Sequence, residues 1–297
     1  MKKILIFCLL FISFSPFHLF SQKYLEIQPL FEYPVAPEEM ESLEERCSFL
    51  VKHFWDNFNF KQKTAVDQHA LNDAFQVYVS ALQYSVEKEN EQSLNILIKQ
   101  ISGNPILLMQ FTKAAEENLY GPRAEIWSDY IYLKFLDAVE KNKKLNISRK
   151  TKYIDQAKAL RMSAVGNAAP SFEFIDKNGE TKNYFSMSTP TLLIFGWPDD
   201  TDWRLSRLKM DSNFKLTELL EKGKLNVLYI IPEYKDNWQE EISNYNKKWT
   251  LGISPEIRKT YDIRINPSVY LIGADGKIVN KTISIGDAVE KALNLVN

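Results

Sequence analysis

The sequence predicts two folded units, an all-α helical domain followed by an α/β domain with a mixed central sheet. In residues 38–163, apolar residues recur at spacings of three and four, which is typical of amphipathic helices. After Gly166, short and almost wholly apolar runs alternate with helical stretches, which is typical of buried strands joined by helices. The length of 297 residues is enough for a separate hydrophobic core in each unit.

Composition narrows the class of protein. The chain is 45% hydrophobic and 25% charged, and these values are typical of a folded globular protein. Its formal net charge is −1, so the overall charge favours neither nucleic acid nor an anionic membrane surface as a partner. We therefore expect no nucleic-acid partner.

Residues 1–21 have the pattern of a signal peptide. Lys2 and Lys3 are followed by an apolar run and then by a polar segment that contains Pro16. This pattern predicts export, with cleavage after Ser21. The alternative is an uncleaved anchor, although the apolar run is shorter than the roughly 20 residues that span a bilayer. No later stretch has the length and apolarity of a transmembrane segment, so none is expected after cleavage.

The helical domain is predicted to occupy residues 22–163. Its helices are expected at residues 38–58, 67–86, 92–101 and 105–121, from Pro122 onward, and from an N-cap at Ser148 to residue 162. Proline at the start and glycine after the end mark several of these boundaries. Short connections between such helices predict mostly antiparallel neighbours.

The second domain is predicted to occupy residues 164–297, with residues 164–170 as the boundary between the two. Strands are expected at residues 171–176, 191–195, 226–231, 268–272 and 277–282, and helices at residues 203–222, 237–248 and 286–296. The last two strands are joined by Asp275 and Gly276, a strong hairpin signal. This order predicts a central mixed sheet with helices on both faces.

Several motifs are similar to those of a known group of envelope proteins. Residues 165–172 read VGNAAPSF, and residues 265–272 read INPSVYLI. Both segments resemble bacterial extracytoplasmic thioredoxin-like proteins of the TlpA-like type, in which the second segment is the cis-proline strand. In the first half, HFWDNF at residues 53–58 and NLY at residues 118–120 resemble an uncharacterised helical domain that often precedes such modules. The resemblance implies a thioredoxin-like second domain and a periplasmic location.

The redox cysteine pair of that family is missing here. The family places Cys-x-x-Cys where a helix follows the strand at residues 191–195, and here this turn reads GWPDDTDW. In this register Asp200 and Trp203 stand where the two thiols would be. Dithiol exchange needs a thiolate at the helix N-terminus and a second thiol to resolve the mixed disulfide. A carboxylate and an indole can do neither, so thiol-disulfide oxidoreductase activity is excluded.

The chain has two cysteines, and neither one supplies the missing pair. Cys8 would leave with the signal peptide, and Cys47 belongs to the helical domain. Cys47 occupies an apolar position of a predicted helix, which favours a small buried residue. A reactive or intermolecular thiol is the alternative.

The degenerate active site is the candidate binding surface. Its residues are Trp197, Pro198, Asp199, Asp200, Trp203, Asn266 and Pro267. The resemblance implies a cis bond before Pro267, and in redox-active relatives this loop holds the substrate peptide by backbone contacts. The alternative is a loop that persists as architecture alone. Trp197 and Trp203 are either an apolar contact patch for a partner or packed beneath the helix.

Other chemistry has weaker support from the sequence. Asp199, Asp200 and Asp202 could form a cation site or supply acid and base groups, although Asp is also a preferred helix N-cap, and capping is favoured. His53 and His69 have no metal-ligand spacing and are interpreted as packing or surface residues. We expect no cofactor and no bound metal.

These observations favour a redox-inactive periplasmic protein that binds an unknown envelope protein or an extended peptide at the degenerate site. The expected mode is backbone pairing against a loop or a sheet edge. A non-redox enzyme built on the three aspartates is one alternative. A structural envelope subunit that binds through its helical domain is another.

Overall fold

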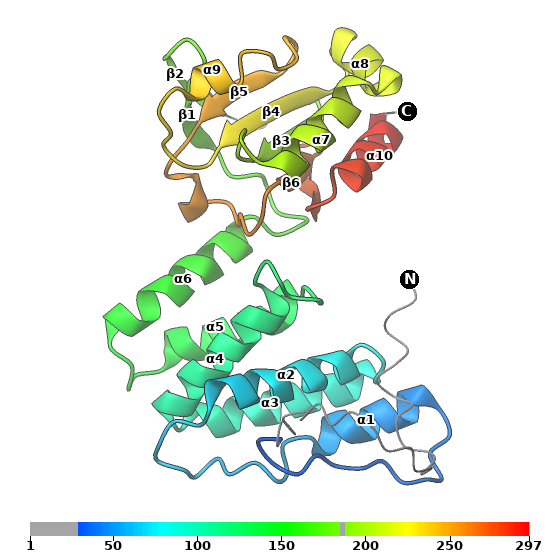
Figure 1. The fold of residues 1–297 in the computed structure, drawn as a ribbon, viewed down its shortest axis with the longest axis vertical. Coiled ribbons are helices and arrows are strands. Elements are labelled where there is room, and N and C mark those ends of the chain that lie inside the picture. The colour runs from blue at the N-terminus through cyan, green and yellow to red at the C-terminus, as the bar shows by residue number, and fades with distance from the viewer. Residues whose placement is uncertain (1–28, 185–187, 297) are drawn as a thin grey trace, which may run out of the picture.

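The computed structural model of the chain describes residues 29–184 and 188–296. The predicted signal peptide, residues 1–21, lies outside this part of the chain. A helical half is followed by a half built on one sheet, as predicted, and helix α6 leads from the first to the second (Figure 1). Within the described ranges, no helix combines the length and the apolarity needed to cross a membrane.

Side-chain caps determine where most helices of the first half begin. These helices are α1 (Leu43–His53), α2 (Gln68–Leu82), α3 (Glu87–Ser102), α4 (Pro105–Leu119), α5 (Asp129–Lys141) and α6 (Ile147–Met162). Ser42 forms a capping box at the start of α1, so that helix does not begin at residue 38 as the sequence predicts. Ser128, and not Pro122, marks the start of α5, and Asn146 replaces Ser148 as the cap of α6. In each case the helix starts where a side-chain oxygen accepts a backbone N–H.

The core of the helical half is rich in aromatic rings. The ring centroid of Trp55 lies 5.0 Å from that of Phe111 and 5.4 Å from that of Tyr78. Phe54 and Phe58, from the same segment as Trp55, are also buried in this core. Such pairs contribute about 0.5–1.5 kcal/mol each beyond the burial of their area. The motif at residues 53–58 therefore has a packing role.

The second half contains a seven-stranded mixed sheet with the strand order β2-β1-β5-β4-β3-β6-β7. The strands are β1 (Phe172–Asp176), β2 (Thr181–Tyr184), β3 (Thr191–Phe195), β4 (Asn226–Ile231), β5 (Thr250–Ile253), β6 (Ser268–Ile272) and β7 (Ile278–Thr282). The pairs β3–β4 and β4–β5 are parallel, and the other pairs are antiparallel. Strands β3 and β6 are buried at every position, as expected of central strands covered on both faces.

The two faces of the sheet are covered differently. Helices α7 (Thr201–Asp211), α8 (Phe214–Glu221) and α10 (Ile285–Val296) pack on one face (Figure 1). The opposite face is covered by the one-turn 3-10 helix η1 (Ile257–Lys259) and the residues after it, a segment for which the sequence predicts no helix.

Two predicted helices of this half differ in extent from the observed ones. The helix expected at residues 203–222 is divided, because Asn213 caps α8. Within residues 237–248 the helix is α9 (Trp238–Glu241), and turns follow it.

The boundary segment, residues 164–170, is hydrogen-bonded to the sheet. The N–H of Gly166 donates to the carbonyl of Ile278 at 2.8 Å, and the N–H of Ile278 donates to the carbonyl of Asn167 at 2.9 Å. The side-chain amide of Asn167 also donates to the carbonyl of Arg161 in α6 at 2.7 Å. The connection between the two halves is therefore fixed to both of them.

Replacing Gly252 in β5 with alanine is expected to lower the free energy of unfolding by about 1–3 kcal/mol or more. A Cβ here would lie 2.4 Å from a ring carbon of Phe174 and 2.7 Å from the carbonyl oxygen of Ile175 in β1. The ring can turn, but the carbonyl belongs to the neighbouring strand, so the strands must separate. Urea unfolding measures the loss. Gly103→Ala is the control, because its nearest neighbouring atom is 3.8 Å away, and an equal effect in the two variants would contradict the close approach.

Candidate functional site

The candidate site lies where β3 ends and α7 begins, opposite the loop that precedes β6. The backbone N–H of Trp197 donates to Asn266 Oδ1 at 3.0 Å, which ties the turn to the loop. Gly196 permits this approach, because a Cβ there would lie 3.0 Å from Asn266 Oδ1 and 3.0 Å from a ring carbon of Tyr229. The Asn266-Pro267 peptide bond is cis. The structure thus brings the sequence-predicted residues of the turn and of the loop together.

Asp200 is the N-cap of α7. Its Oδ1 accepts a hydrogen bond from the N–H of Trp203 at 2.8 Å, and its backbone is extended, as an N-cap requires. The carboxylate also interacts favourably with the positive end of the helix. Pro198 is buried, and its carbonyl accepts a hydrogen bond from Arg204 Nε at 3.2 Å. The capping interpretation of Asp200 is therefore confirmed.

Trp203 fills the interior behind the turn. Its side chain is fully buried, and its ring stacks on Tyr229 with centroids 4.8 Å apart and planes 9° apart. Its indole N–H donates to the hydroxyl of Tyr245 at 2.8 Å. Of the two interpretations left open for this side chain, packing beneath the helix is the one that the structure shows. Trp203 is unavailable to a partner in this conformation.

Asp199 and Asp202 have different surroundings from Asp200. Lys235 Nζ lies 2.9 Å from a carboxylate oxygen of Asp199, and the hydrogen bond from Lys235 holds the pKa of Asp199 below its ordinary value. The side chain of Asp202 is exposed. Among the residues that the structure describes, no three His, Cys, Asp or Glu side chains are grouped so that they could hold a metal ion. The cation-site alternative on these aspartates thus gains no support.

Trp197 lies at the rim of the site, held from two sides. Its indole N–H donates to the carboxylate of Glu233, and the guanidinium of Arg258 lies 5.3 Å from its ring centroid. Part of the ring remains exposed, and Tyr234, the residue after Glu233 in the chain, is 73% exposed. Glu233, Tyr234 and Arg258 are absent from the sequence-predicted site. For Glu233 and Tyr234 a signal existed, because they lie two and three residues after the end of buried strand β4, and ligand sites form at the carboxyl ends of parallel strands.

The remaining sequence candidates lie in the helical half. Cys47 is buried in α1, as expected of a small apolar residue. His53 Nδ1 lies 2.8 Å from a carboxylate oxygen of Asp56, and His69 Nε2 lies 4.0 Å from one of Asp73. These residues take no part in the turn and loop described above.

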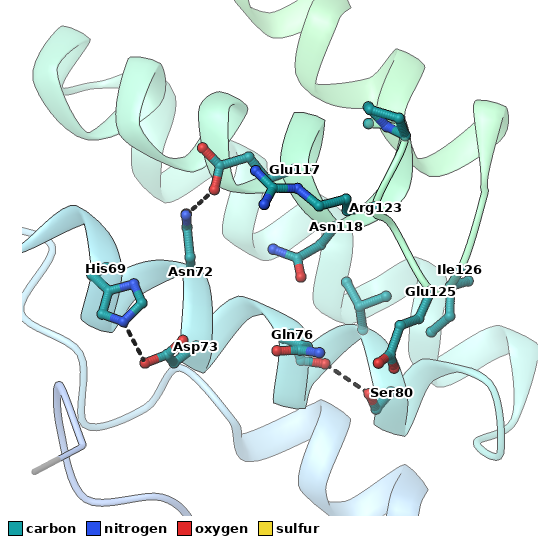
Figure 2. Close-up of a pocket in the computed structure, with 13 residues that line it drawn as sticks. His69, Asn72, Asp73, Gln76, Ser80, Glu117, Asn118, Arg123, Glu125 and Ile126 are labelled. Carbon is teal, nitrogen blue, oxygen red and sulfur yellow. Dashed lines mark hydrogen bonds and ion pairs between the residues drawn. The ribbon is translucent and has the colours of Figure 1, made fainter. Parts of the chain in front are cut away.

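A polar hollow of about 430 Å³ opens on the helical half, between α2 and the connection from α4 to α5 (Figure 2). Asn72, Gln76 and Asn118 contribute amide groups to its lining. Some of these groups already have protein partners, since Asn72 donates to the carboxylate of Glu117. The hollow therefore offers hydrogen-bonding groups to a polar ligand, which bears on the alternative of binding through the helical domain.

Comparisons with known proteins agree with this architecture. Residues 15–163 match the family described as "Domain of unknown function (DUF5106)". The crystal structure of a thioredoxin-like protein from Bacteroides caccae ATCC 43185 is 22% identical with a TM-score of 0.70, and the match covers 90% of this chain and 99% of that chain. No curated protein matches the chain. The chain is thus similar over most of its length to a thioredoxin-like protein, and its fold is thioredoxin-like with a helical half before it.

Shorter structures match part of the chain. A conserved protein of unknown function from Bacteroides fragilis is 25% identical with a TM-score of 0.41, covering 43% of this chain and 98% of that chain. A thiol-disulfide oxidoreductase from Bacteroides fragilis NCTC 9343 is 22% identical with a TM-score of 0.37, covering 43% of this chain and 98% of that chain.

Proposed function

The chain belongs to the DUF5106 family, and we propose that it is an exported, redox-inactive thioredoxin-like protein that binds a partner protein or an extended peptide. The binding surface is the turn at residues 196–200 together with the loop at Asn266 and Pro267. One observation carries the proposal: a helix cap and a buried indole stand where a dithiol would, while the turn and the loop remain joined. The signal-peptide pattern of residues 1–21 supports a periplasmic location.

The chemistry of the turn supports the loss of dithiol exchange. The Asp200 carboxylate is engaged with the N–H of Trp203, and a carboxylate cannot attack a disulfide. Trp203 is fully buried and carries no group that could resolve a mixed disulfide. The sequence holds a single cysteine after residue 21, Cys47, and this residue is buried in α1. A mature chain with one buried thiol cannot cycle between a dithiol and a disulfide.

The groups left at the surface suit the recognition of a protein or peptide. The ring of Trp197 is partly exposed and lies between the opposite charges of Glu233 and Arg258, and Tyr234, next to Glu233 in the chain, is largely exposed. Tryptophan, tyrosine and arginine are enriched where partner proteins bind. This surface differs from the one predicted from the sequence, because Trp203 lies beneath it.

A non-redox enzyme has less support. An acid or base catalyst needs a pKa near the working pH. Instead, the hydrogen bond from Lys235 lowers the pKa of Asp199, which keeps this carboxylate ionised, and Asp200 is engaged in capping. The neighbouring Lys235 has its pKa raised by its hydrogen bond to Asp199, so it stays protonated at neutral pH.

The exported chain is expected to show no turnover in a disulfide-reduction assay and to lose its partner when Trp197 is replaced by alanine. We expect Trp197→Ala to weaken capture of a partner from envelope extract by about tenfold or more, since truncation of a tryptophan that a partner covers has an effect of that size. Tyr84→Ala is the control, because Tyr84 is 49% exposed on the helical half. Equal capture by the two variants, or disulfide turnover that is lost in Cys47→Ser, would contradict the proposal.

The polar hollow of the helical half supports a second candidate, binding through that half. Its amide side chains can hydrogen-bond a polar segment of a partner; one of them is that of Asn118, whose amide nitrogen also donates to the carbonyl of Ala114 at 2.9 Å. If Asn118→Ala abolishes capture and Trp197→Ala leaves it intact, this second candidate replaces the first.

A further inference from the structure

Four charged side chains meet where the two halves of the molecule touch. Asp129 comes from the start of α5, Asp262 and Arg264 from the segment between η1 and β6, and Lys281 from β7. Arg264 Nε lies 2.8 Å from Asp262, and Lys281 Nζ lies 2.9 Å from Asp129. Arg264 also pairs with Asp129, and Lys281 also pairs with Asp262. Each cation thus bridges both acids, and the two positive charges balance the two negative ones.

Three members of this junction cluster are largely removed from water, whereas the side chain of the fourth, Asp129, is 39% exposed. The side chain of Asp262 is 0% exposed, that of Arg264 is 3% exposed and that of Lys281 is 16% exposed. A buried ion pair is costly to break, because removal of one partner leaves an uncompensated charge in a medium of low dielectric constant. The arrangement of the cluster is therefore strongly constrained.

The helical half surrounds the Arg264 side chain. The guanidinium carbon lies 4.4 Å from the ring centroid of Tyr120 and 5.0 Å from that of Trp127, distances typical of cation–π contacts. The hydroxyl of Tyr120 donates to Asp262 Oδ1 at 2.7 Å. Together with Asp129, two aromatic residues at the connection from α4 to α5 therefore hold one arginine of the sheet half.

Arg264 lies two residues before Asn266, and the segment around it is fixed on both sides. Before Arg264, the N–H of Asp262 donates to Ser163 Oγ at 3.2 Å, and the carbonyl of Asp262 accepts from the hydroxyl of Tyr270 at 2.7 Å. After it, Asn266 accepts the backbone N–H of Trp197 at 3.0 Å. We therefore expect a displacement of Arg264 to be transmitted along this short, constrained stretch of backbone to the hydrogen bond between Trp197 N–H and Asn266 Oδ1.

We propose that the helical half sets the position of the cis-proline loop through Arg264, which makes Tyr120, Trp127 and Asp129 positioning residues for the surface formed by Trp197 and Asn266. The description of that surface as a binding surface rests on the proposed function, whereas the coupling itself does not. The helical half thus stabilises one backbone conformation of the loop at Asn266 and Pro267.

Hydrogen exchange of the Trp197 backbone amide tests the coupling in the full exported chain without any partner. This amide is protected by Asn266 Oδ1, so its exchange reports whether the loop is in place. In Asp129→Asn we expect exchange at Trp197 to accelerate about tenfold while the amides of β4 exchange as before. Asp129→Glu keeps the charge and is expected to restore most of the protection. Tyr120→Phe, which removes only the hydroxyl bonded to Asp262, is expected to have a smaller effect of the same kind.

Asp137→Asn is the matched control. Asp137 lies on the same helix, its side chain is 39% exposed like that of Asp129, and its partners Lys141 and Arg161 both lie within the helical half. The proposal is overturned if Trp197 exchanges at the normal rate in both Asp129→Asn and Tyr120→Phe. It is also overturned if Asp137→Asn has the same effect, or if β4 accelerates to the same extent as Trp197. Because no partner is present in this measurement, its outcome is independent of the capture experiment.

Discussion

Replacing Trp203 with alanine is expected to lower the free energy of unfolding by about 3–5 kcal/mol, which is typical of removing a large buried aromatic side chain. The indole is fully buried and stacked on Tyr229, so its loss opens a cavity beside the sheet. The hydroxyl of Tyr245 also loses the indole N–H that donates to it. Urea unfolding of the full chain, followed by circular dichroism, measures the change.

Two further variants separate the contributions of the ring and of its hydrogen bond to the stability lost in Trp203→Ala. Trp203→Phe keeps most of the ring and removes the donor to Tyr245, so it is expected to cost about 1–2 kcal/mol. Trp197→Ala affects a partly exposed side chain and is expected to cost less than Trp203→Ala. If Trp203→Ala unfolded at the same urea concentration as the wild type, the indole would not be the core residue described here.

Replacing Asp262 with asparagine is expected to lower the free energy of unfolding by about 3–5 kcal/mol at neutral pH. The carboxylate is fully buried and pairs with Arg264 and Lys281, and its loss leaves two cations with Asp129 as their remaining acid. The amide can keep a hydrogen bond but cannot balance a charge. Urea unfolding at pH 7 measures this loss, with Asp137→Asn as the exposed control.

The loss of stability caused by Asp262→Asn should become smaller at low pH. Burial by itself would raise the pKa of Asp262, but the charges of Lys281 and Arg264 outweigh it and hold this pKa below its ordinary value. The stabilisation from the ionised carboxylate is therefore complete above the unfolded-state pKa of about 3.9 and is lost as the pH falls through the lower folded-state pKa. The stability difference between wild type and variant should narrow below about pH 4. A constant difference from pH 7 to pH 3 would contradict this account.

The strands could be predicted well wherever they are buried on both faces. Strands β3, β4 and β6 have the bounds that the sequence predicts, because in each a polar first residue is followed by a run of apolar and aromatic residues. Strand β5 is short and contains Gly252, so it shows no periodicity of its own. Its place in the sheet depends on neighbours that are distant in sequence, which local patterns do not reveal.

The stretch after residue 237 shows how a correct pattern can give a wrong element. Trp238, Ile242 and Tyr245 recur at helical spacing, and all three are buried as the pattern requires. The backbone nevertheless leaves the helix after Glu241 and continues in turns. Burial of the apolar side chains was predictable, but the hydrogen-bonding path of the backbone between them was not.

In the candidate site, too, some features could be predicted from the sequence and others could not. The cap at Asp200 could be predicted because it depends on a backbone N–H, that of Trp203, only three residues along the chain. The burial of Trp203 depends on its stacking with Tyr229 on another strand, so the sequence left two interpretations open. The junction cluster was invisible in the sequence, since its members Asp129 and Lys281 are 152 residues apart in the chain.

The boundary segment also covers part of a sheet edge that could otherwise pair with another copy of this chain. Strand β7 lies at one end of the sheet, where unpaired backbone groups can pair with a strand of another molecule. Here Ala168 pairs with Lys277, and the N–H of Ala169 donates to the carbonyl of Gly276 at 2.8 Å, which occupies the start of that edge from within the same chain. Cleavage in this segment would uncover that edge and favour edge-to-edge aggregation of the sheet half.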